Sequence, residues 1–160
     1  MLGDFAVGKT SLVRRFVEGR FDDRYLSTIG VKISRRTVTP NAQTTVHLLV
    51  WDLAGSEEFT GAQASYLQGA AGALLVCDLT RASTLPSVAR YAARLREVNP
   101  FVSVLLLANK ADLVDQHEIF EAQLTEMVGS IQAAGVFLTS AKDGRNVETA
   151  FLQLTHSILK

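Results

Sequence analysis

Four short apolar runs, separated by segments with helical periodicity, constrain the fold of this chain more than any other feature. The runs occupy residues 46–51, 73–77, 102–108 and 136–138, and nearly every position in them is apolar. Such runs are typical of β-strands that are covered on both faces. Because strands alternate with helices, the connections should be right-handed crossovers, and the sequence predicts an α/β fold with a doubly wound, mostly parallel sheet.

The segments between the runs carry the helical pattern. Apolar residues recur with the 3.6-residue period in two of them, at Leu85, Val88, Ala92, Leu95 and Val98 and at Val147, Phe151, Leu154 and Ile158. Residues 31–33 and 37–38, a turn at 40–43 and the run at 46–51 predict an antiparallel hairpin at one edge of the sheet. In sheets of this kind ligands bind beyond the carboxyl ends of the strands, so we expect the functional site in the loops that follow them.

Composition and charge limit the possible functions. The chain has 160 residues, and we expect a single domain over residues 1–160. Its 16 basic and 16 acidic residues cancel, so we expect no general attraction to nucleic acid or to an anionic membrane. The single cysteine, Cys77, excludes an intramolecular disulfide and favours a reducing, cytoplasmic location. No apolar stretch approaches the roughly 20 residues of a membrane-spanning helix. Residues 157–160 hold no cysteine for a prenyl group, so we expect no membrane anchor in this chain.

A glycine-bounded loop lies at the start of the chain. Residues 3–10 read GDFAVGKT, which matches the pattern G-x4-G-K-[ST], and residues 12–17 have the apolar spacing of a helix. Such a loop wraps phosphates with its backbone N–H groups, and the helix that follows adds its N-terminal dipole. In this pattern Lys9 reaches the β- and γ-phosphates, and the Thr10 hydroxyl binds magnesium.

Three further motifs each follow an apolar run. The run at 46–51 ends in D-x-x-G, in which Asp52 can hold magnesium through water and the glycine N–H can approach a phosphate. The run at 102–108 is followed by NKAD, in which the Asp112 carboxylate can accept hydrogen bonds from the N1–H and 2-amino groups of guanine. Adenine offers no such pair of donors. The run at 136–138 is followed by the tripeptide SAK, in which the backbone N–H of Ala141 can donate to the guanine oxygen.

All four motifs occur in one order, each where a doubly wound sheet places its ligand loops. With them the chain resembles the Ras superfamily of small GTPases, and its Rab branch in particular, from Gly3 to its end. The resemblance implies a three-layer P-loop NTPase fold with about six strands and five helices, a mostly parallel sheet and one antiparallel edge hairpin. It also implies that Thr28 is a mobile ligand of magnesium and the γ-phosphate, and that Phe21 stacks on the guanine.

The resemblance assigns the site residues one by one. It implies magnesium ligands at Thr10, Thr28 and Asp52, and catalytic groups at Lys9, Thr28, Gly55 and Ser56. It implies that GTP or GDP contacts Asp4, Phe5, Ala6, Val7, Gly8, Lys9, Thr10, Ser11, Phe21, Thr28, Gly55, Asn109, Lys110, Asp112, Ser140, Ala141 and Lys142.

Three features depart from the family pattern. Ser56 follows the D-x-x-G glycine, where the family normally has a glutamine that orients the attacking water. Phe5 and Ala6 stand where the family usually has small residues, and Phe5 should project near the γ-phosphate. Only two residues precede Gly3, where the family has a full buried strand, so the first strand should be truncated. We expect a misassigned start or a fragment rather than a sheet that lacks most of a central strand, because an empty slot would leave neighbouring backbone groups unpaired.

Two functional hypotheses remain open on the sequence. One is a magnesium-dependent switch that binds GTP and GDP and hydrolyses GTP slowly. The other is a GTP-loaded binding module with negligible hydrolysis, regulated by nucleotide exchange or by expression, and Ser56 and Phe5 are the residues that separate the two. A P-loop ATPase or kinase is a third class, against which Asn109 and Asp112 argue.

The resemblance also implies where partner proteins bind. Effectors, and exchange or activating proteins, should contact switch regions at residues 21–31 and 53–64, and we expect a monomer. Rab proteins usually carry a phenylalanine of a partner-binding aromatic cluster at the position of Ile33, whereas Trp51 and Tyr66 of that cluster remain. The partner surface should therefore differ from that of a standard Rab.

Overall fold

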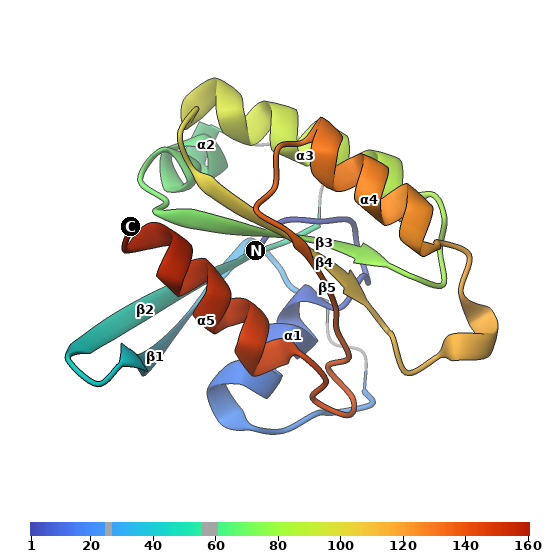
Figure 1. Ribbon diagram of the computed structural model, residues 1–160, viewed down its shortest axis with the longest axis horizontal. Helices are drawn as coiled ribbons and strands as arrows, with labels where there is room; N and C mark the ends of the chain where they lie inside the picture. Colours follow the sequence, from blue (N-terminus) through green and yellow to red (C-terminus); the bar gives the residue numbers. More distant parts are fainter. Residues whose placement is uncertain (25–26, 56–60) are drawn as a thin grey trace.

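The computed structural model describes residues 1–24, 27–55 and 61–160, except for the side chains of 61–63. In chain order the elements are α1 (Lys9–Glu18), β1 (Val31–Asn41), β2 (Thr44–Leu53), α2 (Gly61–Gln68), β3 (Gly72–Asp78), α3 (Thr84–Val98), β4 (Ser103–Asn109), a 3-10 turn (Val114–Gln116), α4 (Glu121–Ser130), β5 (Val136–Leu138) and α5 (Val147–Ile158). Helices α1 and α5 lie on one side of the strands, and α2, α3 and α4 lie on the other (Figure 1). The predicted three-layer α/β architecture is confirmed.

The apolar runs form a parallel sheet in the order β3-β4-β5. Leu75 of β3 lies opposite Leu106 of β4, which in turn lies opposite Val136 of β5. Each of these strands is followed by a loop at the same edge of the sheet, as expected for parallel strands joined by helices. None of the helices in the described ranges is both long enough and apolar enough to cross a membrane.

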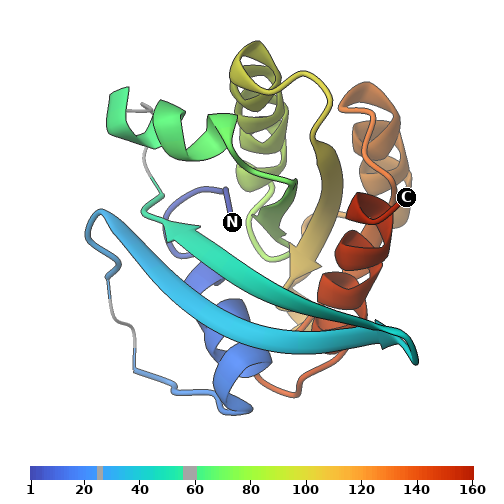
Figure 2. The same cartoon turned by 90° about the vertical axis from the view of Figure 1, so that its left-hand side faces the viewer.

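The predicted hairpin is present and forms a two-stranded sheet of its own. Strand β1 continues without a break through the polar residues 34–36 and ends only at Asn41. The turn therefore contains only residues 42 and 43 and is shorter than predicted. The pairing of β1 with β2 slips between Val38 and Asn41, where Pro40 has no N–H to donate to the ladder. In Figure 2 the hairpin crosses the front of the molecule, next to α1.

The first two residues connect the hairpin to the parallel sheet. Leu2 forms an isolated parallel bridge with β3, since its N–H donates to the Leu74 carbonyl at 2.9 Å and its carbonyl accepts from the Val76 N–H at 2.8 Å. The amino group of Met1 donates to the Trp51 carbonyl of β2 at 2.8 Å. The described part of the chain therefore has five strands, and Leu2 forms one further bridge beside β3.

The parallel strands bury both of their faces. Alternate residues of β3 point to opposite sides, so that Leu75 and Cys77 pack toward α3 while Leu74 and Val76 pack toward α1 and α5. On the second side the Phe16 and Phe151 rings stack with their centroids 3.9 Å apart, which fixes α1 against α5. This packing holds the start of α1 next to the loops at the carboxyl end of the sheet.

Candidate functional site

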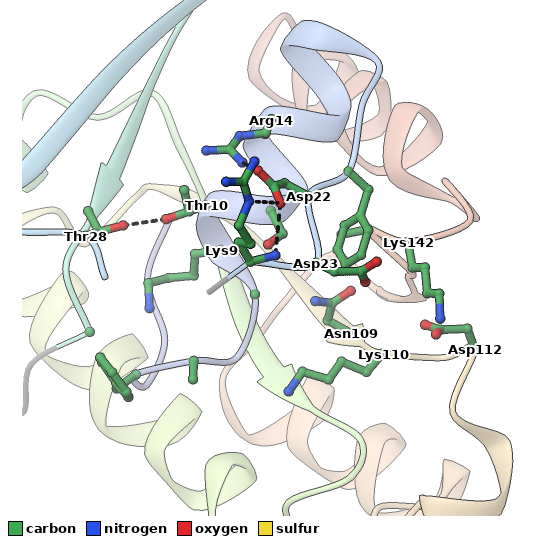
Figure 3. A pocket seen from close by; sticks show the side chains of 18 of the residues that line it. Lys9, Thr10, Arg14, Asp22, Asp23, Thr28, Asn109, Lys110, Asp112 and Lys142 are labelled. Carbon is green, nitrogen blue, oxygen red and sulfur yellow. Dashed lines mark hydrogen bonds and ion pairs between the residues drawn. The ribbon is translucent and has the colours of Figure 1, made fainter. Parts of the chain in front are cut away.

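A cavity of about 390 Å³ lies where α1 begins, beside the loops that follow β4 and β5. Figure 3 shows Thr10 and Thr28 at one end of this cavity and Asp112 with Lys142 at the other. The predicted site residues that line it are Phe5, Ala6, Gly8, Lys9, Thr10, Ser11, Phe21, Thr28, Gly55, Asn109, Lys110, Asp112, Ala141 and Lys142. The structure therefore brings residues of all four motifs to one cavity.

The glycine loop, residues 3–10, curls around the ammonium group of Lys9. Lys9 Nζ donates to the carbonyl oxygens of Gly3 at 2.7 Å and Asp4 at 2.8 Å, and the residue is buried. Burial lowers the pKa of Lys9 from 10.5 to about 8, although the Asp52 and Asp4 carboxylates oppose this shift. At neutral pH the loop therefore carries a desolvated positive charge at the start of a helix, which is where proteins bind phosphate groups.

Position 8 excludes a side chain for two reasons. Its φ of 103° lies in the left-handed region, and a Cβ there would lie 2.2 Å from Nδ2 of Asn109. The same Nδ2 donates to the carbonyl of Val7 at 2.9 Å, and the Thr139 hydroxyl donates to Oδ1 of Asn109 at 3.3 Å. Close backbone approach thus joins the glycine loop to the loop of residues 109–112, here called the NKAD loop.

Three oxygen-bearing side chains meet at the end of the cavity that Thr10 and Thr28 line. Oγ1 of Thr10 lies 2.5 Å from Oγ1 of Thr28 and donates to Oδ2 of Asp52 at 2.5 Å. Asp52 is fully buried, and its Oδ1 has no hydrogen-bond partner among the described residues. A buried carboxylate oxygen without a partner is costly unless a cation or water accompanies it. Hydroxyl and carboxylate oxygens are also the ligands that Mg²⁺ prefers, so these residues fit a magnesium ion.

A different set of contacts orders the opposite end of the cavity. Oδ1 of Asp112 accepts a hydrogen bond from the Ser140 hydroxyl at 2.7 Å. Arg15 of α1 donates through Nε to the Ala141 carbonyl at 2.8 Å and through Nη2 to the Lys142 carbonyl. The Ser140 hydroxyl and the Arg15 guanidinium therefore hold the Asp112 carboxylate, the SAK tripeptide and α1 together.

Several residues that were predicted to bind the nucleotide or magnesium do not line the cavity. Val7 is buried in the core, and Asp4 contributes its carbonyl to Lys9. Ser140 is buried and holds Asp112. Asp52 accepts a hydrogen bond from Thr10, and Ser56 lies outside the described residues.

Gly55 touches the glycine loop directly. A Cβ on Gly55 would lie 2.5 Å from the backbone nitrogen of Phe5 and 2.6 Å from the carbonyl carbon of Asp4. The D-x-x-G motif thus needs glycine here because two backbones meet. The Phe5 side chain lines the cavity with 55% of its surface exposed.

Five lining residues were not predicted from the sequence: Arg14, Asp22, Asp23, Arg24 and Leu113. Oδ2 of Asp22 lies 3.7 Å from Nη1 of Arg14, and Oδ1 lies 3.5 Å from Nε of Arg24, so these three residues form a charged group. One signal was available for Arg14, which follows Thr10 by four residues on α1 and therefore lies on the same helix face. The segment after α1 has no periodicity that would have indicated Asp22, Asp23 and Arg24, whereas Leu113 directly follows the NKAD motif.

A glycine loop that leads into a helix, with a threonine–aspartate pair at its end, defines a P-loop nucleotide-binding protein. The model of the Ras family matches residues 1–160. The chain belongs to the Ras family. It is similar to Ras-related protein Rab-10 of Diplobatis ommata, with 35% identity over 100% of this chain and 80% of that protein. It is also similar to Ras-related protein Rab-22A of Homo sapiens, with 36% identity over 99% and 81%. A third relative is Ras-related protein RABD1 of Arabidopsis thaliana, with 35% identity over 100% and 78%.

Family membership defines the general activity. Ras-family proteins of the Rab type are GTPases and act as GTP-binding molecular switches, and the chain is a small G protein of this kind. The predicted resemblance to the Rab branch and the predicted GTPase class are confirmed.

Proposed function

We propose that this chain is a magnesium-dependent switch that binds GTP and GDP in the described cavity and hydrolyses GTP slowly. The observation that carries the proposal is that one cavity joins the Thr10–Thr28–Asp52 group at one end to Asp112 at the other. The first group suits a metal-bound phosphate, and Asp112 suits the donor edge of guanine.

Each motif has a separate role in this proposal. The backbone N–H groups of residues 4–9 and the Lys9 ammonium bind the phosphates, and Phe21 stacks on the guanine. Magnesium would be held by Thr10 and Thr28 directly and by Asp52 through water, and it would neutralise phosphate charge. Asn109 and Lys110 order the NKAD loop, and Asp112 and Ala141 read the base.

The switch depends on two residues that would contact the γ-phosphate, which GTP has and GDP lacks. Thr28 and Gly55 lie in the two proposed switch segments, residues 21–31 and 53–64, and both line the cavity. Binding of the γ-phosphate would order these segments, and its loss would release them.

Partner proteins would then distinguish the two states through an adjoining surface. The Trp51 and Tyr66 rings lie with their centroids 4.8 Å apart, and Ile33 pairs with Trp51 across the hairpin. Ile33 is 50% exposed, so this surface offers an aliphatic side chain to an effector beside the two rings. We propose an effector with an apolar contact surface that complements this group.

Slow hydrolysis follows from two side chains. Ser56 replaces the glutamine that in this family orients the attacking water, and a serine hydroxyl is too short to contact both the water and the γ-phosphate. Phe5 lines the cavity, and we expect its aromatic ring to lie near the γ-phosphate. Phosphoryl transfer relies on positioning and charge stabilisation, so both changes should slow it.

A single-turnover assay tests this proposal on the purified full chain. The protein is loaded with GTP in EDTA, the reaction is started with Mg²⁺, and GTP and GDP are separated at intervals. We expect a rate constant on the order of 10⁻⁴ s⁻¹ or lower, which is the scale of unassisted hydrolysis in this family. Retention of GTP without detectable GDP would favour the binding module, and failure to load GTP in competition with ATP would refute guanine recognition.

We further propose that residues 1–160 form one domain that acts as a monomer. Light scattering after size-exclusion chromatography tests this, because the expected mass is 17.4 kDa. A mass near twice this value in either nucleotide state would contradict it.

A further inference from the structure

A buried carboxylate at the end of β3 connects to the NKAD loop. Asp78 is fully buried, and its Oδ2 lies 2.6 Å from Nζ of Lys110. Its Oδ1 accepts hydrogen bonds from the backbone N–H of Thr80 at 2.9 Å and from the Thr80 hydroxyl at 2.7 Å. Because Lys110 belongs to the NKAD loop, this carboxylate fixes that loop to the end of β3.

Arg81 extends the connection to the glycine loop. Its Nε donates to Oδ2 of Asp78 at 3.0 Å, and its Nη2 donates to the carbonyl of Phe5 at 2.8 Å. The guanidinium group is planar and rigid, so the two bonds together fix the position of the Phe5 carbonyl relative to Asp78. Gly55 abuts the backbone of Phe5 as well, and the Phe5 peptide is therefore held by two separate segments.

The bonds to Asp78 persist over the physiological pH range. Burial alone would raise the pKa of Asp78, but hydrogen bonds from Lys110 and Thr80 outweigh it and hold the pKa below its usual value. The carboxylate is therefore ionised at neutral pH. Hydrogen bonds to an ionised acceptor are roughly twice as strong as those between neutral groups.

We propose that Arg81 is a positioning residue of the nucleotide site, which together with Asp78 holds the glycine loop at a fixed distance from the NKAD loop. The inference rests on the proposed nucleotide binding and adds a residue that touches neither phosphate nor base. The glycine loop binds the β-phosphate, whereas the NKAD loop binds the base. Arg81 therefore increases the affinity for GDP and GTP and leaves binding of GMP, which has no β-phosphate, unchanged.

Three variants separate this role from other possibilities. Arg81→Gln removes both the positive charge and the planar guanidinium group. Arg81→Lys keeps the charge but cannot bind Asp78 and the Phe5 carbonyl at the same time. Arg94→Gln is the matched control, because it removes an exposed arginine of α3 that does not line the cavity.

Fluorescent GDP dissociation is measured by stopped flow in Mg²⁺, and GMP affinity is measured by competition against the same probe. We expect GDP to dissociate about tenfold faster from Arg81→Gln, as for the loss of one hydrogen bond to a charged group. Arg81→Lys should dissociate GDP at least threefold faster than the wild type, whereas Arg94→Gln should match it. GMP affinity should be equal in all four proteins.

Three results would overturn the inference: a wild-type GDP dissociation rate in Arg81→Gln, full rescue in Arg81→Lys, or an equal loss of GMP and GDP affinity. The second would indicate an effect of charge alone, and the third a general loss of structure. In each of these cases, GDP binding by the wild type and by Arg94→Gln would still support the proposed function. A failure of the inference can therefore be distinguished from a failure of the proposed function.

Discussion

Replacing Asp112 with asparagine tests how the NKAD loop recognises its base. Oδ1 of Asp112 already accepts a hydrogen bond from the Ser140 hydroxyl. In Asp112→Asn the amide oxygen should keep this bond, and the NH₂ group then takes the place of Oδ2. The N1–H and 2-amino groups of guanine are both donors, so a donor on the protein would face donors on the base.

The magnitude follows from the bonds that are lost. Loss of one charge-assisted hydrogen bond costs about 1.5–3 kcal/mol, and each 1.4 kcal/mol is tenfold in affinity. GDP should therefore bind the variant roughly 10- to 150-fold more weakly. Xanthosine diphosphate, whose base has an oxygen in place of the 2-amino group, should bind the variant better than GDP does.

Equilibrium titration with fluorescent GDP, followed by competition with xanthosine diphosphate, measures both effects. The matched control is Asp115→Asn, which alters an exposed carboxylate three residues away that does not line the cavity. An Asp112→Asn protein that binds GDP within twofold of the wild type would refute the assignment of the base-reading residue.

Three further perturbations give distinct results. Ser56→Gln should accelerate single-turnover GTP hydrolysis only when combined with Phe5→Gly, because the ring still hinders the water in the single variant; equal acceleration by Ser56→Gln alone would contradict this. Gly55→Ala should destabilise the GDP-bound protein by about 1–3 kcal/mol in thermal unfolding, because its Cβ meets backbone atoms, whereas Gly69→Ala, which meets nothing within 4 Å, should change little. Burial raises the pKa of the Cys77 thiol to about 12, so a disulfide reagent at pH 8 should label the folded protein far more slowly than the unfolded one; equal rates would show that Cys77 is accessible.

The sequence predicted most of the fold because the strands of the parallel sheet are buried on both faces. Such strands are apolar throughout, and the run at 73–77 lies within the observed β3 (Gly72–Asp78). Strand β1 was harder to delimit, because residues 34–36 are polar and an edge hairpin tolerates them. Arg36, for example, pairs with Glu148 of α5 with an N–O distance of 2.6 Å, a contact that depends on the tertiary fold.

The candidate site was predictable where a short motif carries its own chemistry. Lys9, Thr10 and Asp112 each belong to such a motif, and each lines the cavity. The Arg81–Phe5 contact was not predictable, because it joins residues 76 positions apart. The acceptor is a backbone carbonyl, which every residue has, so the amino-acid sequence does not indicate it. The lining residues after α1 were missed for the related reason that the loop has no periodic pattern.

Hydrogen exchange of residues 21–31 and 53–64 in the two nucleotide states tests the central claim most directly. The wild-type chain is loaded with GDP or with a non-hydrolysable GTP analogue in Mg²⁺, and exchange is followed by mass spectrometry. Because Thr28 and Gly55 should bind the γ-phosphate, we expect slower exchange of both segments with the analogue, and Thr28→Ala should remove this difference around residue 28 while it still binds GDP. Equal exchange of the two segments in the two states of the wild type would contradict the proposed switch.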